Sequence, residues 1–177
     1  MENNFDKNSI YKNAMNYGLI LGLAIIVYTM ILHFFGASQN KIAGWATIAF
    51  MAVAISVGNK ALRDKFQGGY ISFGRSLGSA MLIATFGGLI QGFFTYVFFT
   101  FISPESLQQI FIQMEEAMLQ QGAPEEQIEM TVKMMRSFTT PVMMSVSAVF
   151  GSAFWGLIIG LVASAFIKRE QNIFDQQ

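Results

Sequence analysis

Four long apolar stretches alternate with polar segments along the chain of 177 residues. They cover residues 14–35, 42–59, 76–102 and 141–167, and none of them contains a charged residue. A helix needs about 20 mostly apolar residues to cross bilayer hydrocarbon, because its backbone polar groups must be satisfied internally. The pattern therefore predicts an all-α, polytopic membrane protein with four transmembrane helices in a single membrane domain, residues 1–177.

Residues 103–140 form the one sizeable polar segment between these stretches. Apolar residues recur at helical spacing in two runs, from Leu107 to Met118 and from Ile128 to Phe138, and Gly122 lies between them. Ser103 precedes the first run at the position expected of an N-cap. The segment predicts an amphipathic helical hairpin between the third and fourth spans, lying against the membrane or against the bundle.

Basic residues are distributed unequally between the two sides that these spans define. One side would carry eight: Lys7, Lys12, Lys60, Arg63, Lys65, Arg75, Lys168 and Arg169. The other would carry three: Lys41, Lys133 and Arg136. Because basic residues gather on the cytoplasmic side, we expect both termini in the cytoplasm and the hairpin 103–140 outside it.

Composition supports a membrane class and narrows the chemistry. The chain is 53% hydrophobic and 12% charged, whereas soluble domains carry about 25% charged residues. The formal net charge is zero, so nothing indicates nucleic-acid binding. The absence of cysteine excludes disulfides, thiolate metal sites and a cysteine nucleophile.

Small residues recur at every fourth position in two of the predicted spans. The column of the third span is Ser76, Ala80, Ala84, Gly88 and Gly92. The column of the fourth span is Ala148, Ser152, Gly156, Gly160 and Ser164. Membrane helices associate where small residues let their backbones approach closely. We expect these columns to be packing surfaces, against each other or against a partner protein.

Catalytic and metal-binding constellations are not visible in the sequence, and we expect neither an enzyme nor a cofactor. The spans hold no Asp, Glu, Lys or Arg, which argues against a coupled transporter. Gln91 is the most central strongly polar side chain, and we interpret it as an interhelical hydrogen-bonding group, with substrate contact as the alternative. The single histidine, His33, and the twelve methionines are interpreted as structural rather than as metal or copper ligands.

One stretch, Gly-Gly-Tyr-Ile-Ser-Phe-Gly-Arg at residues 68–75, carries a local binding signal. Ser72 is placed to cap the third helix, whose first N–H groups attract anions. Arg75, together with Arg63 and Lys65, would add contacts to a phosphate. The stretch predicts a lipid-phosphate site of these four side chains, with membrane anchoring and a tight glycine turn as the plainer alternative.

Two sequence motifs carry a family resemblance: residues 68–75 and the closing Ala165-Phe166-Ile167-Lys168-Arg169. Through them the chain resembles an uncharacterised four-span membrane family found mainly in Bacteroidota. The resemblance implies a location in the bacterial inner membrane and carries no established activity. It also implies a possible partner, because members of that family often occur beside a membrane-associated glycosyltransferase.

The sequence is compatible with two functions. The first is a non-enzymatic inner-membrane subunit or scaffold, accessory to an enzyme that uses lipid-linked substrates, with membrane lipids as further partners. The second is a small-molecule or lipid carrier. A solute-wide pore lined by Gln91 and the serines of the fourth helix would favour the carrier, and an exposed glycine column would favour the subunit.

Overall fold

A computed structural model describes residues 7–37 and 41–169, and these divide into two compact units. The first unit comprises the residues up to 91 together with those from 149 onward, and the second comprises residues 92–148. Helices α3 and α6 each have residues in both units. The expectation of a single membrane domain stays a prediction.

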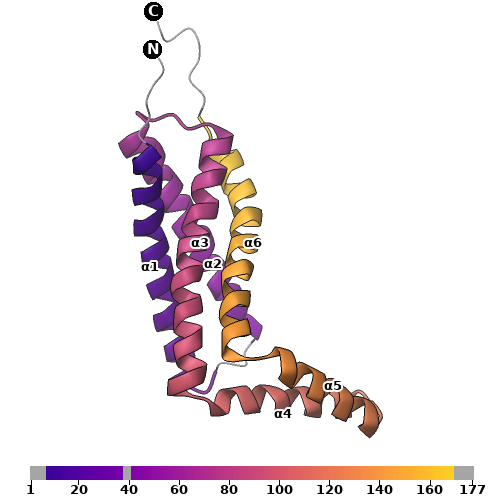
Figure 1. Cartoon of the computed structure of the whole chain (residues 1–177). Coiled ribbons are helices and arrows are strands. Elements are labelled where there is room, and N and C mark those ends of the chain that lie inside the picture. Colours follow the sequence, from indigo (N-terminus) through magenta and orange to yellow (C-terminus); the bar gives the residue numbers. More distant parts are fainter. Residues whose placement is uncertain (1–6, 38–40, 170–177) are drawn as a thin grey trace, which may run out of the picture. The chain divides into compact units, whose positions relative to one another are not determined.

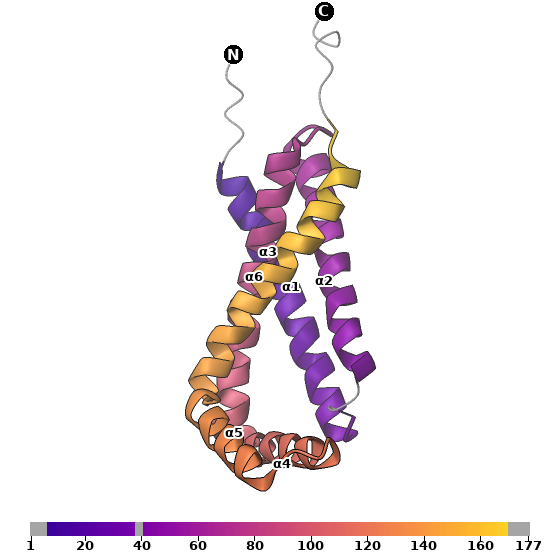
Figure 2. The ribbon, with the colours of Figure 1, turned by 90° about the vertical axis from the view of Figure 1, so that its right-hand side faces the viewer.

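The first unit is built from four long helices that lie lengthwise beside one another (Figures 1 and 2). They are α1 (Lys7–Phe34), α2 (Lys41–Ala61), the part of α3 (Phe73–Val97) up to residue 91 and the part of α6 (Pro141–Ile167) from residue 149, and the π-helical turn η1 (Leu62–Phe66) continues α2. The start of α1, the end of η1, the start of α3 and the end of α6 lie together (Figure 1). This end of the first unit carries Arg63, Lys65, Arg75 and Arg169 and is called the basic end below.

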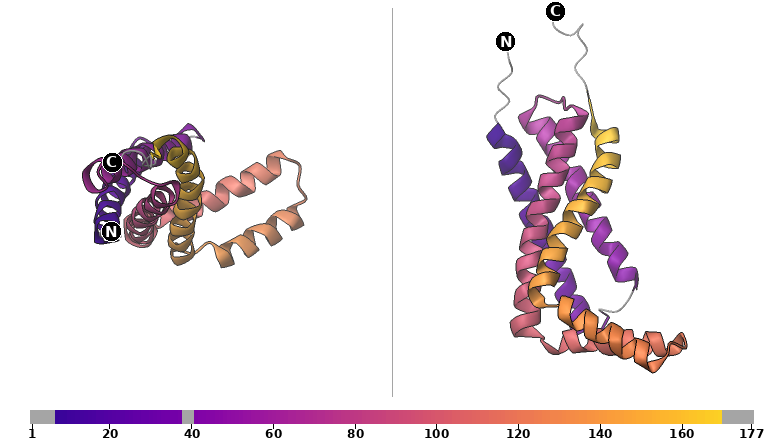
Figure 3. Two further views of the ribbon diagram at one scale, coloured as in Figure 1. Left: turned by 90° about the horizontal axis from the view of Figure 1, so that it is seen from above. Right: turned by 45° about the vertical axis from the view of Figure 1, so that its right-hand side comes forward.

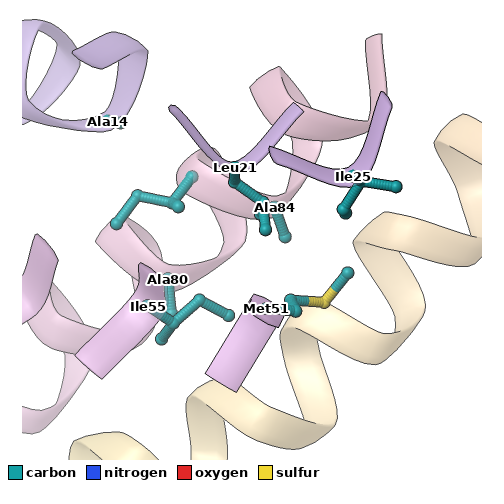
Figure 4. Close-up of a cluster of buried hydrophobic side chains, with 8 residues drawn as sticks. Ala14, Leu21, Ile25, Met51, Ile55, Ala80 and Ala84 are labelled. Atoms are coloured by element: carbon teal, nitrogen blue, oxygen red, sulfur yellow. The ribbon is translucent and has the colours of Figure 1, made fainter. Parts of the chain in front are cut away.

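An apolar core from three of these helices holds the first unit together. Figure 4 shows Leu21 and Ile25 of α1 near Met51 and Ile55 of α2, with Ala84 of α3 beside them. Each of these side chains is at most 4% exposed. Large side chains from α1 and α2 thus meet small ones from α3, which lets α3 approach both neighbours.

Glycines set the spacing between α1 and α3. A Cβ at Gly18 would lie 2.6 Å from the Cβ of Phe86, and one at Gly22 would lie 2.8 Å from the Cβ of Ile90. Real Cβ atoms do not approach so closely, and only glycine permits this contact. In the first predicted span, Gly18 and Gly22 follow Ala14 at intervals of four residues.

The second unit contains a helical hairpin, as predicted. The turn η2 (Phe98–Ile102) precedes α4 (Glu105–Gln120), and α5 (Glu125–Phe138) returns beside it (Figure 3). Gly122 has a positive φ of 74°, and the N–H of Ala123 donates to the carbonyl of Met118 over 3.1 Å. This left-handed glycine ends α4, because its missing Cβ removes the steric penalty there.

The start of α4 differs from expectation. Pro104, not Ser103, occupies the N-cap position, and the Ser103 hydroxyl lies 2.8 Å from the Ser106 hydroxyl instead of capping the backbone. At the start of α6, by contrast, the Thr140 hydroxyl accepts from the N–H of Met143 over 3.3 Å.

The fold class is confirmed: the described residues are almost all helical, and Ile71 and Arg169 form their only β-bridge.

Candidate functional site

The stretch 68–75 forms a tight turn at the basic end. Gly68 and Gly69 have positive φ angles of 61° and 88°, a conformation that other residues rarely adopt. The N–H of Gly69 donates to the carbonyl of Arg63, and the N–H of Tyr70 donates to that of Gln67. The turn therefore uses these donors to hold its own shape.

Ile71 ties this turn to the end of α6. Its N–H and carbonyl form two hydrogen bonds of 3.0 Å with the backbone of Arg169. The guanidinium of Arg169 lies 5.6 Å from the centre of the Tyr70 ring, within cation–π range. Ile71 is buried with Leu62 and Ile167, so residues distant in sequence close the basic end as one small core.

Ser72 and Arg75 lie together because Ser72 caps the start of α3. The Ser72 hydroxyl accepts from the Arg75 N–H over 3.4 Å, and its carbonyl accepts from the Ser76 N–H over 3.0 Å. The bond to the Ser76 N–H is the first intrahelical bond of α3, so the Ser72 hydroxyl satisfies one of the free N–H groups that would attract a phosphate, that of Arg75. The cap at Ser72 follows the sequence prediction, and the role in phosphate binding stays a prediction.

Arg63 and Lys65 are directed to different neighbours. The guanidinium of Arg63 forms an ion pair with Asp64 at 2.7 Å and donates to the carbonyl of Ile167 over 3.4 Å. Lys65 instead lines a groove with Asn13 and other residues of α1. These two basic residues of η1 thus face different helices, Arg63 the end of α6 and Lys65 the helix α1.

A cluster of buried amides and hydroxyls lies near the basic end and was not predicted. The Asn13 amide donates to the carbonyl of Gly58 over 3.0 Å. The Asn59 amide donates to the Ser76 carbonyl over 3.0 Å and to its hydroxyl over 2.9 Å. The first bond links α1 to α2, and the other two link α2 to α3. Asn59 and Ser76 are fully buried.

Some polar atoms of the first unit remain unsatisfied. Within the described part of the first unit, the buried side-chain atoms without a hydrogen-bond partner are Asn59 Oδ1, Gln67 Nε2, Ser79 Oγ and Ser164 Oγ. Short polar residues near the ends of the spans were the sequence signal for this cluster, and the prediction used only Ser76 and Ser164, as packing residues.

The two small-residue columns pack against each other and form a seam between α3 and α6. A Cβ at Gly88 would lie 2.7 Å from the Cβ of Ser152, and one at Gly160 would lie 2.8 Å from the Cβ of Ala80. A Cβ at Gly156 would overlap the Cβ of Ala84. Gly156 and Gly160 of α6 are therefore engaged within the chain.

The register of this seam has a consequence for the polar cluster. Because the columns run antiparallel in steps of four residues, Ser164 falls opposite Ser76. Both side chains are fully buried, and Ser76 already accepts from Asn59. Gly92, the last member of the α3 column, is buried in the second unit.

A groove of about 440 Å³ lies between α2 and α6 at the basic end. Both α2 and α6 approach one another there (Figures 2 and 3). The α2–α6 groove is lined by Ala52, Ser56, Lys60, Ile159, Val162, Ala163, Phe166 and Ile167. Its walls are apolar, and its one charged lining residue, Lys60, follows Ala52 and Ser56 on the same stripe of α2.

The two remaining predicted polar residues, Gln91 and His33, lie on α3 and α1. Gln91 is half-buried on α3 and has an interaction partner. His33 is half-buried near the end of α1, with its ring 6.0 Å from that of Phe34. In residues 7–37 and 41–169, no three His, Asp or Glu side chains gather as a metal site would require.

These features define a class. Four helices, Asn8–Phe34, Gly44–Phe66, Phe73–Ile102 and Pro141–Ile167, are long and apolar enough to cross a bilayer. Their outward surfaces are rich in exposed Leu, Ile, Val and Phe, which water would disfavour and lipid accepts. The chain is a multi-pass helical membrane protein.

The family follows from a comparison with protein-family models. Residues 16–169 match the model described as "Protein of unknown function (DUF4199)", and the chain belongs to this family. The match covers α1 from residue 16 onward, all of α2, α3 and α6, and the hairpin between α3 and α6. No curated protein and no solved structure matches the chain.

Proposed function

We propose that this protein is a non-enzymatic subunit of the bacterial inner membrane that holds a phosphate-headed lipid for a partner enzyme. The partner would act on lipid-linked substrates, as a membrane glycosyltransferase does. The observation that carries the proposal is the α2–α6 groove, because it combines an apolar channel with a cation at the basic end. The likeness to a four-span family of Bacteroidota supports the inner membrane as its location.

The chemistry of the groove fits one lipid chain and an anionic head. Val162 and Phe166 are exposed on the groove side of α6, and Ala52 and Ser56 leave room on α2. Lys60 is exposed at the end of this stripe. An ammonium at the membrane surface attracts anionic head groups by about 1 kcal/mol.

The length of the groove favours a subunit over a carrier. From Ala52 to Lys60 the stripe covers about 12 Å along α2, at about 1.5 Å per residue. Bilayer hydrocarbon is about 30 Å thick, so the groove covers about one leaflet. A carrier would need a path through both leaflets, whereas a subunit that presents a lipid needs only one.

The positive-inside rule supports placing the basic end, and with it both termini, in the cytoplasm. A thiol-labelling experiment tests this orientation, since the chain has no cysteine of its own. Gln121→Cys lies at the end of α4, and Gln171→Cys lies outside the described residues. An impermeant reagent should label only Gln121→Cys in cells with a permeabilised outer membrane. Labelling of Gln171→Cys alone would reverse the orientation.

Native mass spectrometry of the purified protein tests the lipid site. Phosphatidylglycerol and a polyprenyl phosphate would be added separately, with phosphatidylcholine, which has no net charge, as the reference. Lys60→Gln should lower the bound fraction of the anionic lipids at least threefold. Lys65→Gln is the matched control, because Lys65 lines the groove beside α1 and not the α2–α6 groove. Equal losses from both variants would reduce the effect to general surface charge.

A reconstitution experiment separates the subunit from the carrier. In liposomes that contain a fluorescent phospholipid, the protein should leave the rate of transbilayer movement at the protein-free value. In membranes solubilised with mild detergent, it should migrate as an assembly with an enzyme of lipid-linked substrates. Accelerated lipid movement by a protein that migrates alone would contradict the proposal and favour the carrier.

A further inference from the structure

The α5 helix of the hairpin carries an exposed apolar stripe that its partner helix does not cover. Met130, Met134 and Phe138 follow one another at intervals of four residues and are 73%, 56% and 64% exposed. Residues four apart lie on one face of a helix. These three side chains, called the methionine stripe below, therefore form a continuous apolar strip along the length of α5.

The contact between α4 and α5 uses a different part of the same helix. Ile128 of α5 and Phe111 of α4 are buried, at 4% and 6% exposed. The guanidinium of Arg136 lies 4.9 Å from the centre of the Phe111 ring, which fixes the two arms against each other. The apolar face of α5 is thus wider than the contact with α4 requires.

A charged groove occupies the side of α5 that faces away from the methionine stripe. Its charged lining includes Glu115 of α4 and Glu125, Glu129, Lys133 and Arg136 of α5. With about 790 Å³ of space and many charges, this side is suited to water. The hairpin therefore has a wet face and an apolar face in addition to its internal contact.

The connections of the hairpin hold both of its ends close to the ends of the flanking spans. Two residues, Ser103 and Pro104, separate the candidate span Phe73–Ile102 from α4, and two more separate α5 from α6. A link of two residues extends at most about 10 Å between the flanking residues. Phe138 lies three positions before Pro141, where the last span begins.

We propose that the hairpin lies in the membrane interface, with the methionine stripe inserted into the leaflet where α3 ends and α6 begins. An amphipathic helix at this level buries its apolar face at the boundary of head groups and acyl chains. Lipid is the occupant favoured here, because both ends of the hairpin emerge directly from membrane-spanning segments. This inference does not depend on the proposed lipid site at the basic end.

Single cysteines test the insertion, since each added thiol is unique in this chain. Met134→Cys probes the stripe, and its neighbour Lys133→Cys is the matched control in the charged groove. Each variant would carry an environment-sensitive fluorophore and be reconstituted in phosphatidylethanolamine–phosphatidylglycerol vesicles. Lipids brominated near the top of the acyl chain should quench the label at position 134 at least threefold more than that at 133. Aqueous iodide should show the reverse order.

Two results would overturn the proposal. Equal quenching of both labels by iodide, with none by brominated lipid, would place the stripe in water. Protection of position 134 from both quenchers would place it against protein, either a second copy or another part of the chain. Both substituted side chains are exposed, and unchanged gel-filtration profiles would verify that folding is retained. The pair Met130→Cys and Glu129→Cys repeats the comparison one turn earlier, since Glu129 also lines the charged groove.

Discussion

Two adjacent faces of α6 differ in the size of their side chains and in how closely they pack. One face presents Ser152, Gly156 and Gly160 and meets α3 so closely that an added Cβ would collide. The next presents Ile159, Val162 and Phe166 and leaves the α2–α6 groove open toward lipid. In a membrane, apolar area alone does not draw helices together, since lipid tails are equally apolar. Small residues therefore decide where α6 packs, and large ones mark where lipid can stay.

The strongest test of the seam enlarges its tightest glycine. Gly156→Leu should destabilise the protein by about 3 kcal/mol or prevent folding, because the new side chain would overlap Ala84 and its helix. Thermal unfolding in detergent is the measurement. Gly151→Leu is the matched control, since nothing lies within 4 Å of a Cβ there, and it should change stability by less than about 0.5 kcal/mol. Equal melting of both variants and the parent would refute the seam.

A smaller effect is expected at the polar end of the seam. Asn59→Ala removes two hydrogen bonds to Ser76 and leaves buried acceptors unpaired, at a cost of about 2 kcal/mol. The double variant with Ser76→Ala separates the two bonds. Because only the hydroxyl bond depends on the Ser76 side chain, the coupling energy in denaturation should be about 1 kcal/mol. Strictly additive effects would show that this hydroxyl bond contributes nothing.

The smallest change in stability is expected on the groove face. Phe166→Ala removes a side chain that is 86% exposed, so the free energy of unfolding should change by less than about 0.5 kcal/mol. Bound anionic lipid should nevertheless decrease, since Phe166 forms part of the groove wall. Calorimetry and native mass spectrometry of the same preparation measure both quantities. A large loss of stability would mean that Phe166 packs inside the protein.

Much of this architecture could be predicted from local pattern. The last helix begins at Pro141 and ends at Ile167, as expected, because the thickness of hydrocarbon sets the length of an apolar run. The other three helices begin before the predicted spans, since polar first turns such as that of Asn8 can remain helical outside hydrocarbon. Only α2 also continues past its predicted end, whereas α1 ends one residue early and the third span ends in the π-helical turn η2. The spacing of the small residues also indicated which face of α6 would be buried.

The site could be predicted only in part, because long-range partners are not visible in local sequence. Arg63 binds the carbonyl of Ile167, 104 residues away, and Lys65 lines the α1 side instead. Which helix would receive Gly156 also depended on the register between α3 and α6. Lys60 had been counted only as a basic residue of the cytoplasmic side, since its role follows from the approach of α2 and α6.

The most direct test of the central claim blocks the α2–α6 groove without touching the seam. Ser56→Phe places a ring inside the groove, and Val57→Phe places the same ring on an exposed position of α2 outside it. Native mass spectrometry would count bound phosphatidylglycerol and polyprenyl phosphate on each variant. The account predicts that Ser56→Phe loses these lipids while Val57→Phe and the parent keep them, with all three melting alike. Equal lipid binding by the three proteins would contradict it.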